Sequence, residues 1–272
     1  MKLSIITVNL NNAEGLQKTM ESVFAQTFSD YEYLIIDGDS TDGSKELIKK
    51  HQNELGYWVS EKDEGIYSAM NKGIVKARGE YLLFLNSGDY LFTNFSLFEL
   101  FQDSEDEDIV YGNVYVIDEE KKWIKTYPSK LSFSFFLGDS LHHQSCIIKR
   151  HLFDKLGLYN TEFKIISDWE FCMNAICLHR ASYKYLDSCV SVFRRDGFSS
   201  LLDNVELFKK ERAAVIYKTY QAFIPDYDKA AKTKLELEEC KSSLNNINNS
   251  RLYKFVKRTA NNSFIRIIRN LF

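Results

Sequence analysis

The sequence predicts an α/β fold, with a mostly parallel sheet in the first half, a mixed and more antiparallel second half, and a helical C-terminal tail. Three observations support this prediction. Short apolar runs alternate with helical patterns up to residue 92, which is typical of repeated βα units. Paired strand patterns begin at Ile109. A long helical pattern follows residue 200.

The first half consists of apolar runs that alternate with helices. The predicted strands are residues 3–8, 31–37, 57–60 and 80–85, and the predicted helices begin near Glu14, Ser44 and Gly65. Leu16, Met20 and Val23 recur at the spacing of one helical face, which indicates packing against the sheet. The uninterrupted apolar run from Tyr81 to Leu85 is typical of a strand that is buried on both faces.

The second half and the tail have different patterns. We predict strands over 109–118, 121–127 and 142–150, helices near 151–157 and 167–178, and a further helical pattern to about residue 223. The sequence therefore predicts a main domain over residues 1–200, with halves at 1–92 and 93–200, and a helical extension over 201–272.

The helical extension contains two distinct patterns. Leu237, Cys240, Leu244 and Ile247 form a single heptad stretch within residues 230–249, which favours a homo-oligomer but is too short to establish a coiled coil. Residues 251–272 contain six Lys or Arg residues, no acid, and interleaved apolar residues. A basic amphipathic helix binds membrane surfaces, but docking on its own domain explains the pattern equally well.

Composition limits the class of protein. The chain has 272 residues, 44% of them hydrophobic and 27% charged, with a net charge of −3, so we expect no nucleic-acid partner. Its five cysteines form no C-x-x-C pair, and the N-terminal apolar stretch is too short for a signal peptide or a membrane span. These features favour reduced thiols and a cytoplasmic location, with peripheral contact to the inner face of the membrane through the tail.

Polar side chains follow each of the first four predicted strands. The four loops begin with Thr7 to Asn12, with Asp37, with Glu61 to Glu64, and with Asn86 to Asp89. Glycine and Asx residues are common in turns, so each loop alone is weak evidence. Because ligands bind at the carboxyl ends of parallel strands, the four loops together predict a site for a metal and a nucleotide or polyhydroxylated ligand.

Five ordered motifs carry a resemblance to a known family. They are "SIITVNLNN", "IIDGDSTDGS", "EKDEGIYSAMNKGI", "FLNSGDYL" and "ISDWEF". In this order the motifs resemble the family 2 glycosyltransferases of GT-A fold, of the type found in bacterial exopolysaccharide or O-antigen biosynthesis. The resemblance covers roughly residues 1–200, and it implies a Rossmann-like nucleotide-binding half and an acceptor half.

The resemblance implies which residues contact the nucleotide. They are Thr7, Asn9, Asp37, Asp63, Ser87 and Gly88. A carboxylate accepts hydrogen bonds from a base N–H or a ribose hydroxyl. Capping of the helix near Ser44 is the alternative role for Asp37 and Asp42; we favour the ligand for Asp37 and the cap for Asp42.

The resemblance also implies a metal site. Asp89 is similar to the last carboxylate of the family's "DxD" motif, which holds a divalent cation at the donor diphosphate. The first Asp of the motif is Asn86 or Ser87 here, depending on the alignment. One carboxylate, phosphate oxygens and water can still bind Mn²⁺ or Mg²⁺.

Asp168 is the expected catalytic residue. Ser167 and Glu170 form an S-x-x-E pattern, which predicts a capping box at the start of a helix and places Asp168 in its first turn. The general base of the family lies at this place, which implies an inverting reaction in which Asp168 accepts the proton of the attacking hydroxyl. Trp169 is expected to stack on an acceptor sugar or to lie in the core.

Three further residues are weaker candidates. His142 and His143 lie in a predicted strand, where alternation lets only one of them face the site, and we choose His143. Arg194 and Arg195 precede a Gly/Ser loop that, by resemblance, closes over the diphosphate. One of these guanidinium groups is expected to bind phosphate.

The sequence thus predicts a metal-dependent inverting glycosyltransferase that uses a nucleotide sugar, and we expect a UDP-sugar. The resemblance and the basic tail favour a lipid-linked or oligosaccharide acceptor in cell-surface glycan synthesis. Two alternatives remain open. One is a degenerate transferase that only binds nucleotide or glycan. The other is a sugar-nucleotide pyrophosphorylase, which disagrees with an N-terminal loop, "TVNLNNAEG", that lacks Arg and Lys.

Overall fold

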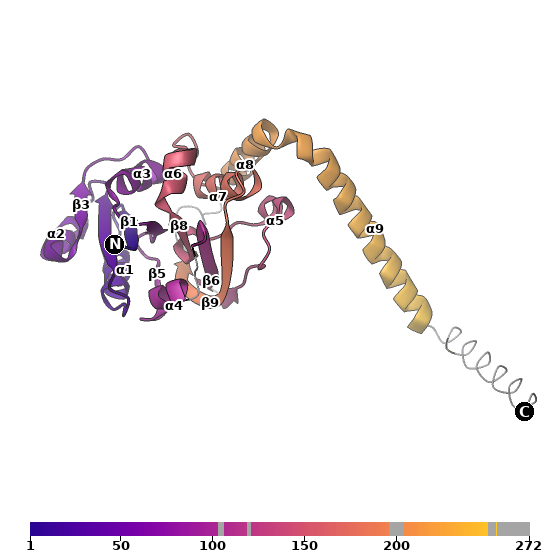
Figure 1. The fold of residues 1–272 in the computed structure, drawn as a ribbon, viewed down its shortest axis with the longest axis horizontal. Helices are drawn as coiled ribbons and strands as arrows, with labels where there is room; N and C mark the ends of the chain where they lie inside the picture. The colour runs from indigo at the N-terminus through magenta and orange to yellow at the C-terminus, as the bar shows by residue number, and fades with distance from the viewer. Residues whose placement is uncertain (103–105, 119–120, 196–203, 250–253, 255–272) are drawn as a thin grey trace, which may run out of the picture. The chain divides into compact units, whose positions relative to one another are not determined.

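The computed structural model describes residues 1–102, 106–118, 121–195, 204–249 and 254 (Figure 1). The chain forms two compact units, Met1–Val215 and Ile216–Phe272. The division of the chain at residues 92 and 200 stays a prediction.

The first unit is built on one mixed sheet. Its strands are β1 (Leu3–Asn9), β2 (Tyr31–Asp37), β3 (Tyr57–Ser60), β4 (Tyr81–Phe84), β5 (Tyr90–Leu91), β6 (Ile109–Ile117), β7 (Lys122–Lys125), β8 (Cys146–Lys149) and β9 (Tyr183–Arg194). Their order is β3-β2-β1-β4-β8-β6-β9-β5, and β7 pairs with β6. Strands β1 to β4 are parallel, whereas β8 runs antiparallel to both β4 and β6. The predicted α/β class, parallel first half and mixed second half are confirmed.

The described part of the chain also forms α-helices. They are α1 (Ala13–Phe24), α2 (Ser44–Lys50), α3 (Ile66–Lys76), α4 (Ser96–Gln102), α5 (Phe133–Gly138), α6 (Arg150–Leu156), α7 (Ser167–Cys177), α8 (Val205–Thr219) and α9 (Ile224–Asn249). Short 3₁₀ helices occur at η1 (Gln52–Glu54), η2 (His143–Ser145) and η5 (Gln221–Phe223).

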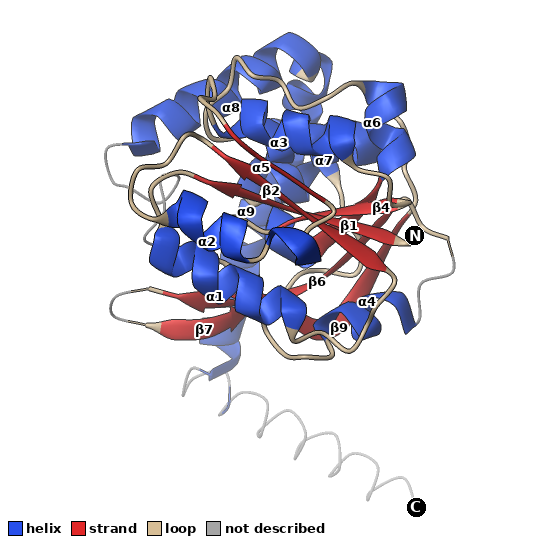
Figure 2. Ribbon diagram, turned by 90° about the vertical axis from the view of Figure 1, so that its left-hand side faces the viewer, coloured by secondary structure: helices blue, strands red, loops and turns tan. Residues whose placement is uncertain are grey.

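Strand β1 is apolar because both of its faces are covered. Ile5 belongs to the same buried cluster as Leu16 and Met20 of α1. Ile6 points to the opposite face and meets α3, where a Cβ on Gly73 would lie 2.4 Å from Ile6 Cγ2. Since only glycine permits this approach, Gly73 lets α3 pack closely on the sheet, and helices lie on both of its faces (Figure 2).

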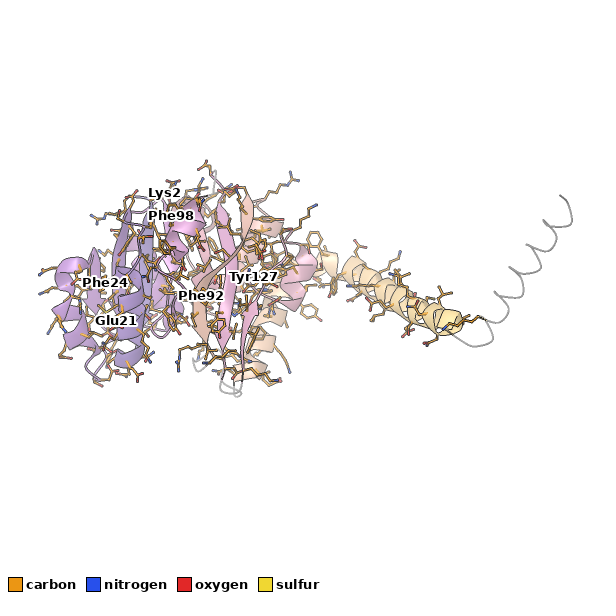
Figure 3. All side chains as sticks on the ribbon, turned by 90° about the horizontal axis from the view of Figure 1, so that it is seen from below. Lys2, Glu21, Phe24, Phe92, Phe98 and Tyr127 are labelled. Atoms are coloured by element: carbon orange, nitrogen blue, oxygen red, sulfur yellow. The ribbon has the colours of Figure 1, made fainter. Side chains whose placement is uncertain are left out.

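Strand β9 and the short elements β5, α4 and α5 were not predicted from the sequence. Strand β5 has two residues, too few for a period to be recognised, and it pairs with β9. The chain then continues to Phe92, which is labelled in Figure 3. The ring centroid of Phe92 lies 5.6 Å from that of Tyr115 in β6. The pairing of β5 with β9 places the loop that follows β4 beside the end of β9.

The second unit contains α9, on which Leu237, Leu244 and Ile247 are exposed. A homo-oligomer through residues 230–249 stays a prediction. The expected membrane contact through residues 251–272 falls, apart from Lys254, outside the described residues. A search of the described residues finds no helix with the length and hydropathy needed to cross a membrane.

Candidate active site

Three loops meet at the carboxyl ends of β1, β2 and β4. Asn9 and Asp37 are register partners at the ends of β1 and β2. The loop after β4 is tied to β1 through Ser87 N, which donates to Val8 O at 3.1 Å. Asn12 Nδ2, just before α1, donates to Ser87 O at 3.0 Å. The polar residues of these loops therefore lie along one edge of the sheet.

Asp37 is the centre of a buried hydrogen-bond network. Its side chain has no exposed surface, and it accepts hydrogen bonds from Asn9 Nδ2 at 2.7 Å, from Ser60 Oγ at 2.6 Å, and from both N and Oγ of Ser40 at 3.0 and 2.6 Å. Burial raises the pKa of Asp37, but these hydrogen bonds outweigh it and hold the pKa below its usual value. The carboxylate is thus an ionised structural anchor between β1, β2 and β3.

Two other predicted nucleotide contacts are also held by protein groups. Thr7 has no exposed surface and donates to Leu85 O at 2.7 Å. Asp63 lies 2.7 Å from Lys72 Nζ, and its Oδ2 would lie 3.6 Å from a Cβ on Gly38. Their contacts with a nucleotide, like that of Asp37, stay predictions.

The loop from Asn86 to Asp89 has a defined shape. Gly88 has φ of +102°, a left-handed conformation that favours glycine, and its N–H donates to Thr19 Oγ1 at 3.0 Å. Thr19 Oγ1 also lies 2.6 Å from Asp89 O. Asp89 is 7% exposed, and its Oδ1 accepts a long hydrogen bond of 3.3 Å from Arg194 N. Helix α1 and β9 thus hold the two sides of this loop.

Asp168 lies in the first turn of α7 and contacts two other elements. Its Oδ1 accepts a hydrogen bond of 2.8 Å from the hydroxyl of Tyr67 in α3. Its Oδ2 lies 2.9 Å from Nδ1 of His143, at the start of η2. The side chain remains 17% exposed, so part of the carboxylate is open to a substrate. A third residue, Asn86, continues the chain of contacts, with Nδ2 3.2 Å from His143 Nε2.

The pKa values in this cluster are coupled. Burial raises the pKa of Asp168, but the hydrogen bond and charge of His143, together with the Tyr67 hydroxyl, lower it below its usual value. Burial lowers the pKa of His143, but Asp168 and the more distant charge of Asp89 raise it above 6.5. Asp168 is therefore an ionised carboxylate held by two donors, and Asp89 is near enough to act on the same imidazole.

Asp168 favours the charged form of His143, whereas the contact with Asn86 favours the neutral form. An amide Nδ2 can only donate a hydrogen bond, so this contact favours the form of His143 in which Nε2 is unprotonated. In that form Nδ1 carries the proton and donates a hydrogen bond to Asp168. In this arrangement Asn86 Oδ1 is buried and has no hydrogen-bond partner among the described residues.

Asn86 and Asp89 offer the oxygen atoms that a divalent cation prefers. Mg²⁺ and Mn²⁺ prefer oxygen ligands, and Asn86 Oδ1 is a buried acceptor in need of a partner. Among the residues that the structure describes, no three His, Cys, Asp or Glu side chains form a group able to hold an ion. The protein would therefore supply few ligands, and a nucleotide and water would supply the others.

Two sequence predictions about local structure were wrong. Ser167 is the first residue inside α7 rather than its cap, its Oγ has no partner in the described part of the chain, and no capping box forms. His142 and His143 precede β8 rather than lying in it, so alternation along a strand does not apply. Burial, together with the charge of Lys125, lowers the pKa of His142 to about 3, which leaves it a neutral, partly buried residue beside Tyr127.

Trp169 and Arg195, two of the remaining candidates, already have protein partners. Trp169 is 3% exposed, its Nε1 donates to Phe136 O at 2.9 Å, and the Arg212 guanidinium lies 4.3 Å from its ring centroid, so a sugar would have to displace Arg212 to stack there. Arg195 pairs with Asp118 at 2.8 Å.

Arg194 lies closer to the loops of the site. Its backbone N–H contacts Asp89, and its charge contributes to lowering the pKa of Glu14 at the start of α1, after the larger effects of Lys18. Of the two arginines, Arg194 is thus placed beside the loops that end β1 and β4. The Gly/Ser loop that follows Arg195 falls outside the described residues.

Sequence reasoning missed Tyr67 as a site residue. Tyr67 is 5% exposed and shares a helical face with Met70 and Ile74, so its spacing is that of a core residue. Only its hydroxyl distinguishes it, because a buried Tyr O–H usually needs a partner. That requirement was the one available signal.

The chain is similar to known glycosyltransferases. The model of the family described as Glycosyl transferase family 2 matches residues 4–159. A PGL/p-HBAD biosynthesis glycosyltransferase of Mycobacterium bovis is 28% identical over 215 residues, which cover 76% of this chain and 82% of the relative. An uncharacterized glycosyltransferase of Mycobacterium tuberculosis is 30% identical over 191 residues, with 64% and 68% covered.

Two solved structures are similar in fold. S. aureus TarS in complex with UDP-GlcNAc has a TM-score of 0.61 and 21% identity, with 74% of this chain covered, and the chain spans only 60% of the TarS chain. The mannosyltransferase PcManGT from Pyrobaculum calidifontis in complex with GDP-Man and Mn²⁺ has a TM-score of 0.59 and 14% identity, with 100% and 87% covered. These likenesses show a GT-A-like fold. Since the family model matches more than half of the chain, the protein belongs to glycosyl transferase family 2 and is a glycosyltransferase.

Proposed function

We propose that this glycosyltransferase moves a sugar, with inversion, from a nucleoside diphosphate donor to an acceptor hydroxyl, and that Asp168 is the general base. The observation that carries the proposal is the series of contacts from Asp168 through His143 to Asn86. It joins a partly exposed carboxylate to the loop after β4, at the sheet edge where α/β proteins bind ligands.

The chemical step follows from these positions. The acceptor hydroxyl gives its proton to Asp168 while its oxygen bonds to the anomeric carbon, and the bond from that carbon to the diphosphate breaks. Tyr67 and His143 hold the carboxylate in place. Because these two groups also stabilise the ionised form of Asp168, the carboxylate is a weak base, and the proton moves late in the step.

The donor site lies on the other side of His143. Asp89 and the buried Asn86 Oδ1 would hold Mn²⁺ or Mg²⁺, and such a cation offsets the charge of a leaving diphosphate. The backbone N–H of Arg194 contacts Asp89, and we propose that its guanidinium binds the diphosphate. The bound ligands of the two structural neighbours, UDP-GlcNAc and GDP-Man with Mn²⁺, support a nucleotide-sugar donor. Of the two nucleotides, UDP and GDP, we propose that the donor carries UDP.

The acceptor is proposed on different grounds. The relative from Mycobacterium bovis carries a biosynthetic name, PGL/p-HBAD biosynthesis glycosyltransferase, which supports a role in making a glycoconjugate. A lipid-linked or oligosaccharide acceptor, used in cell-surface glycan synthesis at the cytoplasmic face of the membrane, fits this support. Family membership argues against the pyrophosphorylase alternative.

The test compares UDP release by the wild type, Asp168→Ala and Asp89→Ala, each with Mn²⁺ and with EDTA. We expect both variants to lose about two orders of magnitude or more in turnover, and the wild type to lose activity in EDTA. Asp154→Ala is the matched control, because Asp154 is 68% exposed and pairs only loosely with Arg150 at 3.7 Å.

The outcomes separate the alternatives. Unchanged turnover in both Asp168→Ala and Asp89→Ala would reject the assignment. A degenerate binding protein would show a nucleotide-dependent rise in melting temperature but no UDP release in any variant. A screen of nucleotide sugars with Mn²⁺, followed by the same melting measurement, identifies the donor.

A further inference from the structure

Helix α8 carries a buried carboxylate that holds the segment directly before α7. Glu211 is 7% exposed. Its Oε1 accepts a hydrogen bond of 2.8 Å from Lys164 N, and its Oε2 accepts one of 3.1 Å from Ile165 N. These two N–H groups lie a few residues before Asp168, so each oxygen of Glu211 fixes the backbone that leads into the helix of the proposed base.

The next residue of α8 holds the other side of the same helix start. Arg212 Nη2 donates to the backbone oxygens of Phe136, and of Asp139 at 2.7 Å. Its guanidinium carbon lies 4.3 Å from the ring centroid of Trp169, the residue after Asp168, and the indole Nε1 donates to the same Phe136 oxygen. Burial lowers the pKa of Arg212 to about 10, so the group stays charged at neutral pH.

We propose that Glu211 and Arg212 are positioning residues for Asp168. Together they fix the backbone before Asp168 and the side chain after it, while neither contacts the carboxylate itself. This matters because a displacement of about 1 Å in a reacting group can reduce turnover by as much as a hundredfold. The inference rests on the proposed function. The inference gives α8 a role in positioning the proposed base, and α8 lies beyond residues 4–159, which the family model matches.

Charge and hydrogen bonding argue for this role over simple packing. A buried carboxylate is costly unless its oxygens are satisfied, and here both oxygens are used on two consecutive backbone N–H groups. An apolar residue could fill the same space but could not hold those N–H groups. Likewise, the planar guanidinium of Arg212 both stacks on an indole and donates to two carbonyls, which Lys cannot reproduce.

The experiment uses the full chain and four variants: Glu211→Gln, Arg212→Lys, Asp168→Asn and the double variant of Glu211→Gln with Asp168→Asn. Glu206→Gln is the control on the same helix, because Glu206 is 84% exposed and pairs with Lys209. Turnover is expressed per folded molecule, with the folded fraction measured by circular dichroism. Any loss of folding is thereby removed from the comparison.

We expect Glu211→Gln and Arg212→Lys each to reduce kcat about tenfold with the donor KM within about twofold, and Glu206→Gln to match the wild type. If Glu211 acts through Asp168, Glu211→Gln will lower the residual rate of Asp168→Asn by less than about twofold. Equal losses in both backgrounds, or kcat near wild type in Glu211→Gln and Arg212→Lys, would overturn the inference.

The proposed function fails separately from this inference. It fails when Asp168→Asn retains wild-type turnover. The positioning inference fails when Asp168→Asn is inactive but the two α8 variants turn over normally. If Glu211→Gln does not fold, Glu211→Asp provides the same comparison, because it keeps the carboxylate but shortens the side chain. Its kcat is expected to lie between the wild-type value and the tenfold reduction expected for Glu211→Gln.

Discussion

Asp37 and Asp168 are two carboxylates with lowered pKa values in very different settings. Asp37 has no exposed surface and accepts four hydrogen bonds from loops at its own sheet edge. The Asp168 side chain is 17% exposed to solvent. It contacts the hydroxyl of Tyr67 in α3 and the imidazole of His143 in η2. A lowered pKa therefore does not by itself identify a reactive carboxylate. Incomplete burial and incomplete hydrogen bonding distinguish the one that can accept a proton from a substrate.

The comparison predicts different consequences for removing each charge. Asp37 lies where three strands meet, so its loss should affect folding. Asp168 lies in the first turn of a helix that other residues also hold, so its loss should affect chemistry. The predictions below begin with the largest expected effect.

Asp168→Asn is expected to reduce kcat by roughly 10² to 10⁴, because an amide cannot accept the proton of the attacking hydroxyl. The donor KM should remain within about threefold, since Asp168 acts on the acceptor. Steady-state kinetics at saturating donor measures both quantities. A kcat within tenfold of the wild type would mean that another group accepts the proton.

Asp37→Asn is expected to lower the free energy of unfolding by about 3 kcal/mol, because the new amide N–H groups face donors that previously bound a carboxylate. Urea denaturation monitored by circular dichroism measures the change. Asp39→Asn is the matched control, since Asp39 is an exposed neighbour in the same loop. Equal stability of the two variants would show that the Asp37 network is not a structural anchor.

Tyr67→Phe is expected to lower kcat about tenfold, since it removes one hydrogen bond to the charged base. Burial raises the pKa of Asp168 and the Tyr67 hydroxyl helps to lower it, so the variant should have a higher pKa at this carboxyl. The acid limb of the pH–kcat profile should accordingly move to higher pH. A shift in the other direction would contradict the assignment of this limb to Asp168.

Asp42→Ala should have the smallest effect, about 1 kcal/mol of unfolding free energy at pH 7, because it removes hydrogen bonds from Ser44 and Ala13 in an exposed loop. Burial raises the pKa of Asp42, but these hydrogen bonds lower it below its usual value. The stabilisation is therefore present above an unfolded-state pKa of about 3.9 and is lost as pH falls through the folded value. Urea titrations at pH 7 and pH 3 should show the difference between the variant and the wild type shrinking; a difference that grows at low pH would contradict the sign.

Much of the fold was predictable from the sequence, for a physical reason. The strands β1, β2 and β4 are buried on both faces, so β4 is a continuous apolar run and β1 and β2 are mostly apolar. Helix α1 was visible because only one of its faces is buried. The short elements β5 and α5 are too brief for any period to develop. Their positions depend on pairing with distant strands and helices, which a local pattern does not contain.

The site was predictable only in part. Asp89 and Asp168 follow or begin regular elements, so their positions were visible from local patterns and motifs. Tyr67 has the spacing of a core residue, and Glu211 lies far along the chain from the loop it holds. Such contacts between distant residues depend on tertiary structure, and no local pattern distinguishes Glu211 from an ordinary helix surface residue.

The most direct test of the account is kcat per folded molecule, at saturating donor, for Asp37→Asn and Asp168→Asn measured side by side. The account predicts that folded Asp37→Asn turns over within about threefold of the wild type, whereas Asp168→Asn is slower by roughly 10² or more although it is fully folded. The reverse ranking, or equal losses in both variants, would contradict the division between a structural and a catalytic carboxylate.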